Sequence, residues 1–177
     1  SRNFATKLWN ATRFAMMNGA TVEGELPAVD SLNAIDKWIL SRLSETVSEV
    51  DSLLEKYEFA RACEILYHFA WDDLCDWYLE LSKETFAGTD SQKTKRVLGH
   101  VLDQLLRLLH PVMPFITEQL WTTLTGAESL VIAKWPVADA AHVDKASEKL
   151  VTQMQEIITD VRRFRNDQGI KTSLKIP

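Results

Sequence analysis

Apolar residues recur at helical spacing along almost the whole chain. A first stripe, at steps of three and four residues, consists of Phe4, Leu8, Ala11 and Ala15. It predicts a helix that ends at Asn18 and Gly19, a pair typical of helix C-termini. Residues 19–30 follow, with two glycines and a proline, and this composition predicts a loop.

Two longer helices are predicted next, over about residues 31–57 and 58–86. The stripe of the first consists of Ile35, Ile39, Leu43, Val47, Val50, Leu54 and Tyr57. The stripe of the second consists of Phe59, Cys63, Leu66, Ala70, Leu74, Trp77 and Leu81. Because Tyr67, Trp71 and Tyr78 widen this second apolar face, we expect that helix to be central and covered on more than one side.

Three more helices are predicted, over about residues 91–110, 114–125 and 144–167. The residues expected inward in the first of these are Leu98, Val101, Leu102, Leu105, Leu106 and Leu109, and the stripe of the last is Leu150, Met154, Ile157, Val161 and Phe164. The stretch before the last helix lacks a helical period, and there we predict a short extended segment over 129–133.

Together these elements predict an all-α fold, an antiparallel bundle of four to five long helices plus a short one. The bundle should span residues 1–168, and residues 169–177 should begin a following small domain. Connections are short, so helices adjacent in sequence should be neighbours. The chain has only 6 glycines and 5 prolines in 177 residues, and this scarcity disfavours an all-β sandwich or barrel.

Several features favour a cytoplasmic location. No run of 18 apolar residues is present, so we expect no membrane span. No signal peptide is visible at the N-terminus. Cys63 and Cys75 lie in one predicted helix, about 18 Å apart along its axis, too far for a disulfide. Reduced thiols fit a cytosolic protein.

Charge is unevenly distributed. The formal net charge is −5, which by itself argues against nucleic-acid binding. Residues 1–22, however, carry three basic residues and no acid, and residues 161–177 carry five basic residues and one acid. Two basic ends therefore flank an acidic body, an arrangement that can place a polyanion at one region and repel it elsewhere. Chance clustering on a solvated surface is the alternative.

Enzyme signatures are absent. The sequence contains no glycine-rich phosphate loop and no H-E-x-x-H motif. His68, Asp72, Cys75 and Asp76 share one helix, and a metal-dependent hydrolase could use them, but a surface hydrogen bond for His68 and a solvated acidic face fit better. We therefore expect no metal site and no catalytic residue here. We interpret the six tryptophans as anchors of the core.

The first helix carries a second arc, about 100° around from its apolar stripe. This arc holds Asn3, Lys7, Asn10 and Phe14, with Arg13 at its flank. An exposed aromatic ring framed by amides and cations suits unpaired RNA: the ring stacks on a base, the amides bond to base edges, and the cations meet phosphate. The alternative is that Phe14 packs against another helix. A second basic candidate is the helix end with Arg162, Arg163 and Arg165, which could equally be a solvated terminus favoured by the helix dipole.

Four segments resemble the anticodon-binding domain of valyl-tRNA synthetases. They are residues 2–14 (RNFATKLWNATRF), 36–43 (DKWILSRL), 108–121 (LLHPVMPFITEQLW) and 128–136 (ESLVIAKWP). The third segment is shared in looser form by isoleucyl, leucyl and methionyl relatives, whose anticodon-binding domains remain an alternative. One departure is Gln119, where the family often has Glu.

The resemblance implies a class I synthetase that joins valine to its tRNA with ATP. Its catalytic domain, with H-I-G-H and K-M-S-K-S motifs, would precede residue 1, so this piece needs no cofactor and should not catalyse a reaction alone. The partners implied are the anticodon loop of valine tRNA and the rest of the synthetase chain, and we expect a monomer. Lys7, Asn10, Arg13 and Phe14 fall on the family's anticodon-contacting positions. A helical protein-interaction module remains the competing hypothesis.

Overall fold

The computed structural model describes residues 2–88 and 91–170, and no strand occurs within those ranges. The predicted all-α fold is confirmed. Its main helices are α1 (Arg2–Met17), α2 (Ala34–Glu55), α3 (Phe59–His68), α6 (Ser91–Leu109), α7 (Pro114–Thr125) and α8 (Lys145–Asp167). Shorter pieces are the π-helix η2 (Phe69–Tyr78), α4 (Leu79–Leu81), α5 (Lys83–Ala87) and the 3-10 turns η1 (Val29–Ser31), η3 (Leu130–Ile132) and η4 (Ala140–His142).

Local signals set most helix ends. The Asn33 side chain accepts a hydrogen bond from the Asp36 backbone N–H at the start of α2, and Asp144 does the same for Ser147 at the start of α8. These caps satisfy backbone donors that have no partner inside the helix. Pro114 occupies the first turn of α7, and Gly126 ends that helix in the left-handed conformation, with φ of 71°.

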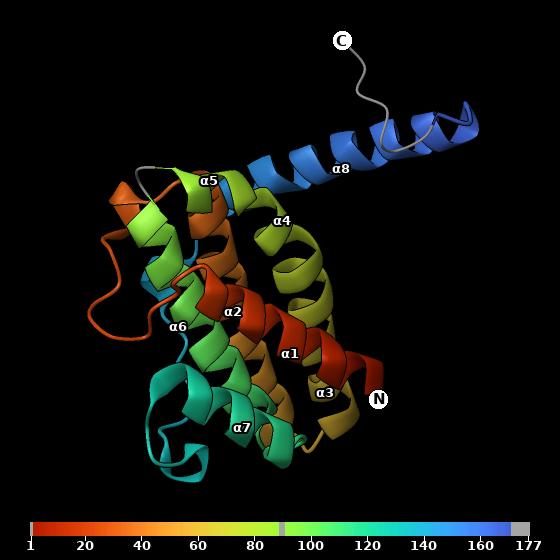
Figure 1. The fold of residues 1–177 in the computed structure, drawn as a ribbon. Helices are drawn as coiled ribbons and strands as arrows, with labels where there is room; N and C mark the ends of the chain where they lie inside the picture. The colour runs from red at the N-terminus through yellow and green to blue at the C-terminus, as the bar shows by residue number, and fades with distance from the viewer. Residues whose placement is uncertain (1, 89–90, 171–177) are drawn as a thin grey trace.

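Long helices surround a continuous apolar core. All six α6 residues expected inward are buried, together with the α2 residues Ile39, Leu43, Val47 and Val50. Helix α1 crosses the front of this bundle, packing on α6, with η2 on one side and α7 on the other (Figure 1). This placement puts the predicted RNA-facing helix on the outside of the bundle.

The segment predicted as one helix over 58–86 is divided. Helical residues continue through Leu81, but η2 has π-helical turns and the chain bends at Ser82 between α4 and α5. A π-turn contains more residues than an α-turn, yet the predicted stripe residues Leu66, Ala70 and Leu74 are buried. Phe59 and Cys63 of α3, expected inward, are exposed. Tyr78, predicted on the widened apolar face, is fully buried.

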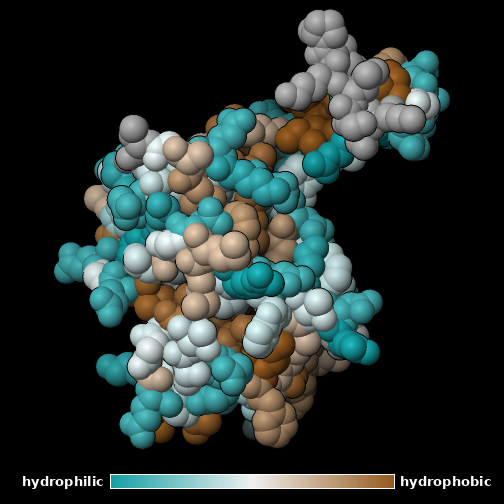
Figure 2. All heavy atoms as spheres, viewed as in Figure 1, coloured by the Kyte–Doolittle hydropathy of each residue, from teal (hydrophilic) through white to brown (hydrophobic). Residues whose placement is uncertain are grey.

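Helix α8 leaves the bundle. Its first turns pack on α2, where Val151 is buried, and its later turns project beyond the other helices (Figure 1). The predicted stripe is present but not covered: Ile157, Val161 and Phe164 are exposed, and hydrophobic side chains are visible along this projection (Figure 2). Trp77 of η2 contacts Arg162 in this part of α8, but the apolar stripe stays exposed there.

Two local predictions were wrong, and one lies outside the described residues. Leu130–Ile132 forms a 3-10 turn instead of an extended segment, because the Ser129 side chain accepts the Val131 N–H and the Glu118 carboxylate accepts the Leu130 N–H. Helix α2 ends at Glu55. Tyr57, which the sequence analysis placed on the apolar stripe of this helix, has φ of 58° and is 80% exposed. The predicted small domain begins at residue 169, but residues 171–177 are not described, so that boundary stays a prediction.

Within residues 2–88 and 91–170, no helix has both the length and the apolar character that crossing a membrane requires. Both cysteines are free thiols. Cys63 is exposed, and burial raises the pKa of the partly buried Cys75 thiol to about 12, which keeps it protonated and unreactive at neutral pH.

Candidate nucleic-acid interface

The apolar stripe of α1 orients the helix. Phe4, Leu8, Ala11 and Ala15 are buried against the bundle. Since residues three and four apart share a helix face, this burial fixes where the second arc points. That arc faces the neighbouring segment formed by η2 and α4.

A groove of about 230 Å³ runs between α1 and that segment. From α1 it is lined by Lys7, Asn10, Ala11 and Phe14, and from the other side by Cys75, Leu79, Glu80 and Lys83. The structure thus brings three of the predicted RNA-binding residues to one hollow. Asn3 and Arg13 are exposed on the same helix but do not line it.

The Phe14 ring is half-buried, whereas the sequence analysis predicted a freely exposed ring. It packs edge-on against Phe86 of α5, with 5.8 Å between ring centroids. The alternative weighed from the sequence, packing against another helix, therefore describes part of this ring's environment. The remaining part lines the groove, so the ring can offer a partial stacking surface there.

Lys7 is held on the η2 side of the groove. Its Nζ lies 2.5 Å from Asp76 Oδ1 and 4.3 Å from the centre of the Trp71 ring. Asp76 on the neighbouring segment therefore already neutralises the charge of Lys7, one of the residues predicted to contact phosphate. Binding of a phosphate to Lys7 has to compete with this ion pair.

Asn10 and Arg13, unlike Lys7, have no side-chain partner among the described residues. Both side chains are exposed, and neither forms a hydrogen bond or ion pair with any residue in the described ranges. An amide and a guanidinium with unused donors therefore stand next to the Phe14 groove. These groups can bond to base edges and phosphates without first breaking an intramolecular contact.

The three arginines of α8 are less available. Arg162 stacks on Trp77 at 5.6 Å, and Arg163 forms an exposed ion pair with Asp160 at 2.9 Å. Arg165 is partly buried and lines, with Arg162, a hollow of about 540 Å³ along the apolar stripe of α8. These side chains are not gathered at the α1 groove, and their role in RNA binding stays a prediction.

The acidic side chains of η2 are paired and do not form a merely solvated face. His68 Nδ1 lies 2.7 Å from Asp72 Oδ2, as expected for a surface hydrogen bond, and this bond raises the pKa of His68. Arg42 Nε lies 3.1 Å from Asp73 Oδ2, and burial raises the Asp73 pKa. Among the described residues, no three His, Cys, Asp or Glu side chains are placed to hold a metal ion.

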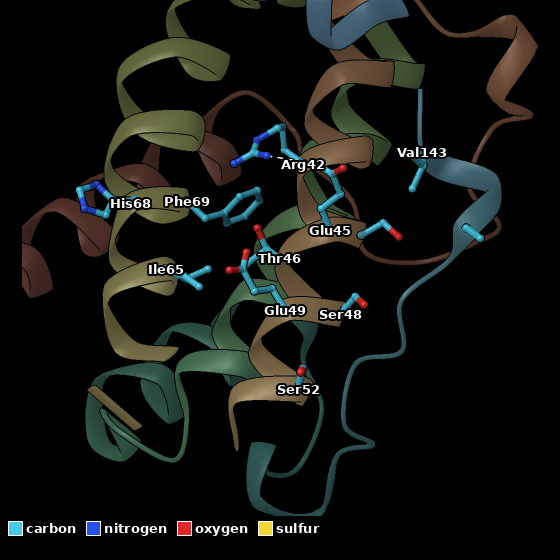
Figure 3. A pocket seen from close by; sticks show the side chains of 12 residues that line it. Arg42, Glu45, Thr46, Ser48, Glu49, Ser52, Ile65, His68, Phe69 and Val143 are labelled. Carbon is cyan, nitrogen blue, oxygen red and sulfur yellow. Dashed lines mark hydrogen bonds and ion pairs between the residues drawn. The ribbon is translucent and has the colours of Figure 1, made fainter. Parts of the chain in front are cut away.

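Another hollow, about 680 Å³, lies between α2 and α3 beside η4 (Figure 3). Ile65 and Phe69 form its apolar side, while Glu45 and Glu49 stand on α2. Arg42, which also lines it, is paired with Glu45 at 3.0 Å as well as with Asp73. This acidic lining disfavours a polyanion, so the α1 groove is the better RNA candidate despite its smaller volume.

Sequence reasoning missed the far side of the groove. The far side is lined by Leu79 and Glu80 of α4 and by Lys83 of α5. These residues lie more than 60 positions after the α1 residues of the groove in the sequence. Nothing local indicates that pairing of segments. The tryptophan interpretation was also only partly right: Trp38 and Trp121 are buried anchors, whereas Trp9 and Trp135 are exposed.

Comparison with known proteins places this geometry in a family context. The family model described as the anticodon-binding domain of tRNA ligase matches residues 36–177. Valine–tRNA ligase of Streptomyces avermitilis is 60% identical over the whole of this chain, that of Streptomyces coelicolor 57% and that of Mycobacterium tuberculosis 54%. The chain spans only 20% of the length of each of these relatives.

A solved structure is also similar. It is the ternary complex of Agrobacterium radiobacter K84 agnB2 LeuRS, tRNA and LeuAMS, with a TM-score of 0.56 and 26% sequence identity. The match covers 80% of this chain and 16% of that chain. The helical arrangement described above is therefore found in a tRNA synthetase.

Proposed function

We propose that this chain, which belongs to the family of anticodon-binding domains of tRNA ligases, binds the anticodon stem-loop of a tRNA through the exposed side of α1. The observation that carries the proposal is the trio Asn10, Arg13 and Phe14. The amide and the guanidinium have no partner among the described residues, and the ring lines the adjoining groove. A base can stack against the ring while the polar groups bond to its edge and to the neighbouring phosphate.

The tRNA is proposed to be a valine tRNA. Support comes from the 60% identity to a valine–tRNA ligase over the whole chain and from the opening segment that includes Lys7, Asn10, Arg13 and Phe14. The longer enzyme would esterify valine to that tRNA with ATP, in the cytoplasm and as a monomer. ATP and the catalytic residues would then belong to the remainder of the enzyme.

Helix α8 supports a further partner, the rest of the synthetase polypeptide. Its projecting part exposes Ile157, Val161 and Phe164 on one face, and an uncovered stripe of this kind is typical of a surface that contacts another protein part. Arg162, Arg163 and Arg165 share this helix and could contact the RNA only if the bound tRNA extends along α8.

Titration of the 177-residue chain with a fluorescent valine anticodon stem-loop tests the proposal. We expect binding that weakens as salt is raised, because phosphate contacts release counterions. Phe14→Leu, which keeps apolar packing but removes the ring, and Arg13→Ala should each weaken binding by about 5- to 30-fold. Thermal melting checks that each variant folds.

Matched controls are Phe115→Ala, an exposed phenylalanine on α7, and Arg61→Ala, an exposed arginine on α3. Equal binding by the α1 variants and these controls would overturn the proposal. Salt-independent binding to a protein part would instead favour the interaction module. Tighter binding of an isoleucine, leucine or methionine stem-loop would assign the domain to that relative.

A further inference from the structure

The hollow between α2 and α3 is separate from the proposed RNA face. It shares no lining residue with the α1 groove, and its volume of about 680 Å³ is typical of a ligand site. Helix α2 forms its floor, Ile65 and Phe69 of α3 stand on one side, and Val143 stands on the other (Figure 3). We call it the α2–α3 hollow.

Thr46 places an unused hydroxyl in the floor of this hollow. The residue is only 3% exposed, and its Oγ1 forms no hydrogen bond with any described residue. This hydroxyl is not closed off from solvent as the partnerless hydroxyls of Thr12 and Ser82 are, and it projects from α2 toward the α3 side (Figure 3). Because hydroxyls of such buried residues normally have a partner, the Thr46 hydroxyl points to a ligand.

Glu49 supplies an unpaired charge beside that hydroxyl. It lies three residues after Thr46, on the same face of α2, and its exposed carboxylate extends toward Ile65 (Figure 3). It has no ion pair among the described residues. The other ionisable side chains of the lining already have partners, in the pairs Arg42–Glu45, Arg42–Asp73, Glu45–Lys145 and His68–Asp72. One negative charge of the lining is therefore available to a ligand.

We propose that the α2–α3 hollow binds the side chain of one arginine, presented by a segment of a partner protein. The guanidinium would donate hydrogen bonds to the Glu49 carboxylate and to Thr46 Oγ1. The aliphatic part of the arginine would lie along Ile65, which is half-buried at the α3 wall. Arginine fits better than lysine, because its rigid fork of donors can reach a carboxylate and a neighbouring hydroxyl together.

Charge distinguishes this occupant from other ligands. The acidic lining repels RNA, so the hollow is unsuited to the polyanion proposed for α1. A free polyamine carries several positive charges and would need several unpaired carboxylates, whereas the lining offers only Glu49 within the described residues. A single basic side chain matches this single charge. The proposal does not depend on the proposed function, because it concerns another face and another partner.

Titration of the isotope-labelled 177-residue chain with a blocked Ala-Arg-Ala tripeptide tests the proposal by nuclear magnetic resonance. We expect weak, saturable binding, with amide shifts concentrated at the α2 and α3 residues of the hollow. The same tripeptide with citrulline in place of arginine is its uncharged isostere. It should bind about 5- to 10-fold more weakly, because the charge-assisted bond to Glu49 is lost.

Glu49→Gln should weaken binding of the arginine tripeptide by a similar factor, about 5- to 10-fold. The matched control is Glu55→Gln, which removes an equal charge from an exposed position on α2 outside the hollow. It should change affinity by less than about 2-fold. An equal loss in both variants would show only general electrostatic attraction and would overturn the proposal.

Thr46 provides a readout that separates binding from folding. Thr46→Val removes a hydroxyl without an internal partner, so it should weaken tripeptide binding about 3-fold without lowering the melting temperature. Thr46→Ser keeps the hydroxyl and should retain the affinity of the wild type. A lower melting temperature for Thr46→Val with unchanged tripeptide affinity would show a purely structural role and would contradict the site.

Two further results would overturn the proposal. Equal affinities for the arginine and citrulline tripeptides would show that the hollow does not recognise a cation. Spermidine, titrated separately, is the probe for a free polyamine. If spermidine binds the hollow more tightly than the tripeptide and displaces it, a polyamine and not a protein side chain is the ligand.

Discussion

Lys7 of α1 and Asp76 of η2 form an ion pair, with 2.5 Å between Nζ and Oδ1, across the groove that also holds Phe14. Both side chains are partly solvent-exposed, so the pair contributes little to the stability of the fold. Its larger consequence is for binding, because a phosphate and the Asp76 carboxylate would compete for the same ammonium group.

Removing the acid should therefore strengthen RNA binding. In Asp76→Asn we expect stem-loop affinity to rise about 3- to 10-fold at low salt, with a salt slope steeper by about 1, because Lys7 becomes free to neutralise a phosphate. Fluorescence titration at several salt concentrations measures both quantities. Asp72→Asn removes an equal charge from the same segment without touching Lys7, and an equal gain in that control would point to general electrostatics instead.

Tyr78 should matter for stability through one hydrogen bond. Its buried hydroxyl donates to Asp36 Oδ1 at 2.6 Å, while Thr94 donates to Oδ2 of the same carboxylate at 2.7 Å. Tyr78→Phe leaves the buried carboxylate short of a donor, and we expect a loss of about 2–3 kcal/mol of unfolding free energy in urea. Tyr57→Phe, at an 80% exposed position, should change it by less than about 0.5 kcal/mol. Equal effects would show that the bond to Asp36 is not stabilising.

Gly99 marks a close crossing of two segments. A Cβ built there would lie 2.0 Å from the backbone oxygen of Thr21, where the loop after α1 passes over α6. Gly99→Ala should displace that loop and cost about 2–4 kcal/mol, measured by thermal or urea unfolding. Gly88→Ala, whose Cβ would lie 3.4 Å from the nearest atom, serves as the control. A variant as stable as wild type would contradict the close contact.

The burial of His100 should make the stability of the fold sensitive to acid. Burial, and then the charge of Arg96, lower its pKa from 6.5 to about 4. The folded state therefore binds fewer protons at His100 than the unfolded state between these pH values. The contribution of neutral His100 to the free energy of unfolding is complete above about pH 6.5 and is lost as the pH falls towards 4. It amounts to roughly 1–3 kcal/mol.

Urea unfolding at pH 7 and pH 4.5 measures this effect. His100→Gln should lose less stability than wild type on acidification. His68→Gln is the control, because hydrogen bonding to Asp72 raises the pKa of His68. A raised pKa contributes stability at low pH that is lost as pH rises, so this variant should not flatten the acid-induced loss. Parallel pH profiles for wild type and His100→Gln would contradict the assignment.

Sequence by itself determined the helices and most of their ends. The ends of α1, α6, α7 and α8 agree with the predicted ones to within about a residue, because Asn18, Pro114, Gly126 and Asp144 act on backbone groups a few residues away. It also determined that α1 carries two faces, since helical periodicity needs no distant partner.

Only the tertiary structure decided how those faces are used. The ion pair of Lys7 joins residues 69 positions apart, Phe86 covers part of Phe14, and Ile157, Val161 and Phe164 of the α8 stripe are exposed. Cys63 of α3 lies on the predicted apolar stripe but is exposed. The physical reason is common to all four: helix formation depends on neighbours within one or two turns, whereas burial and charge pairing depend on which distant segment packs alongside.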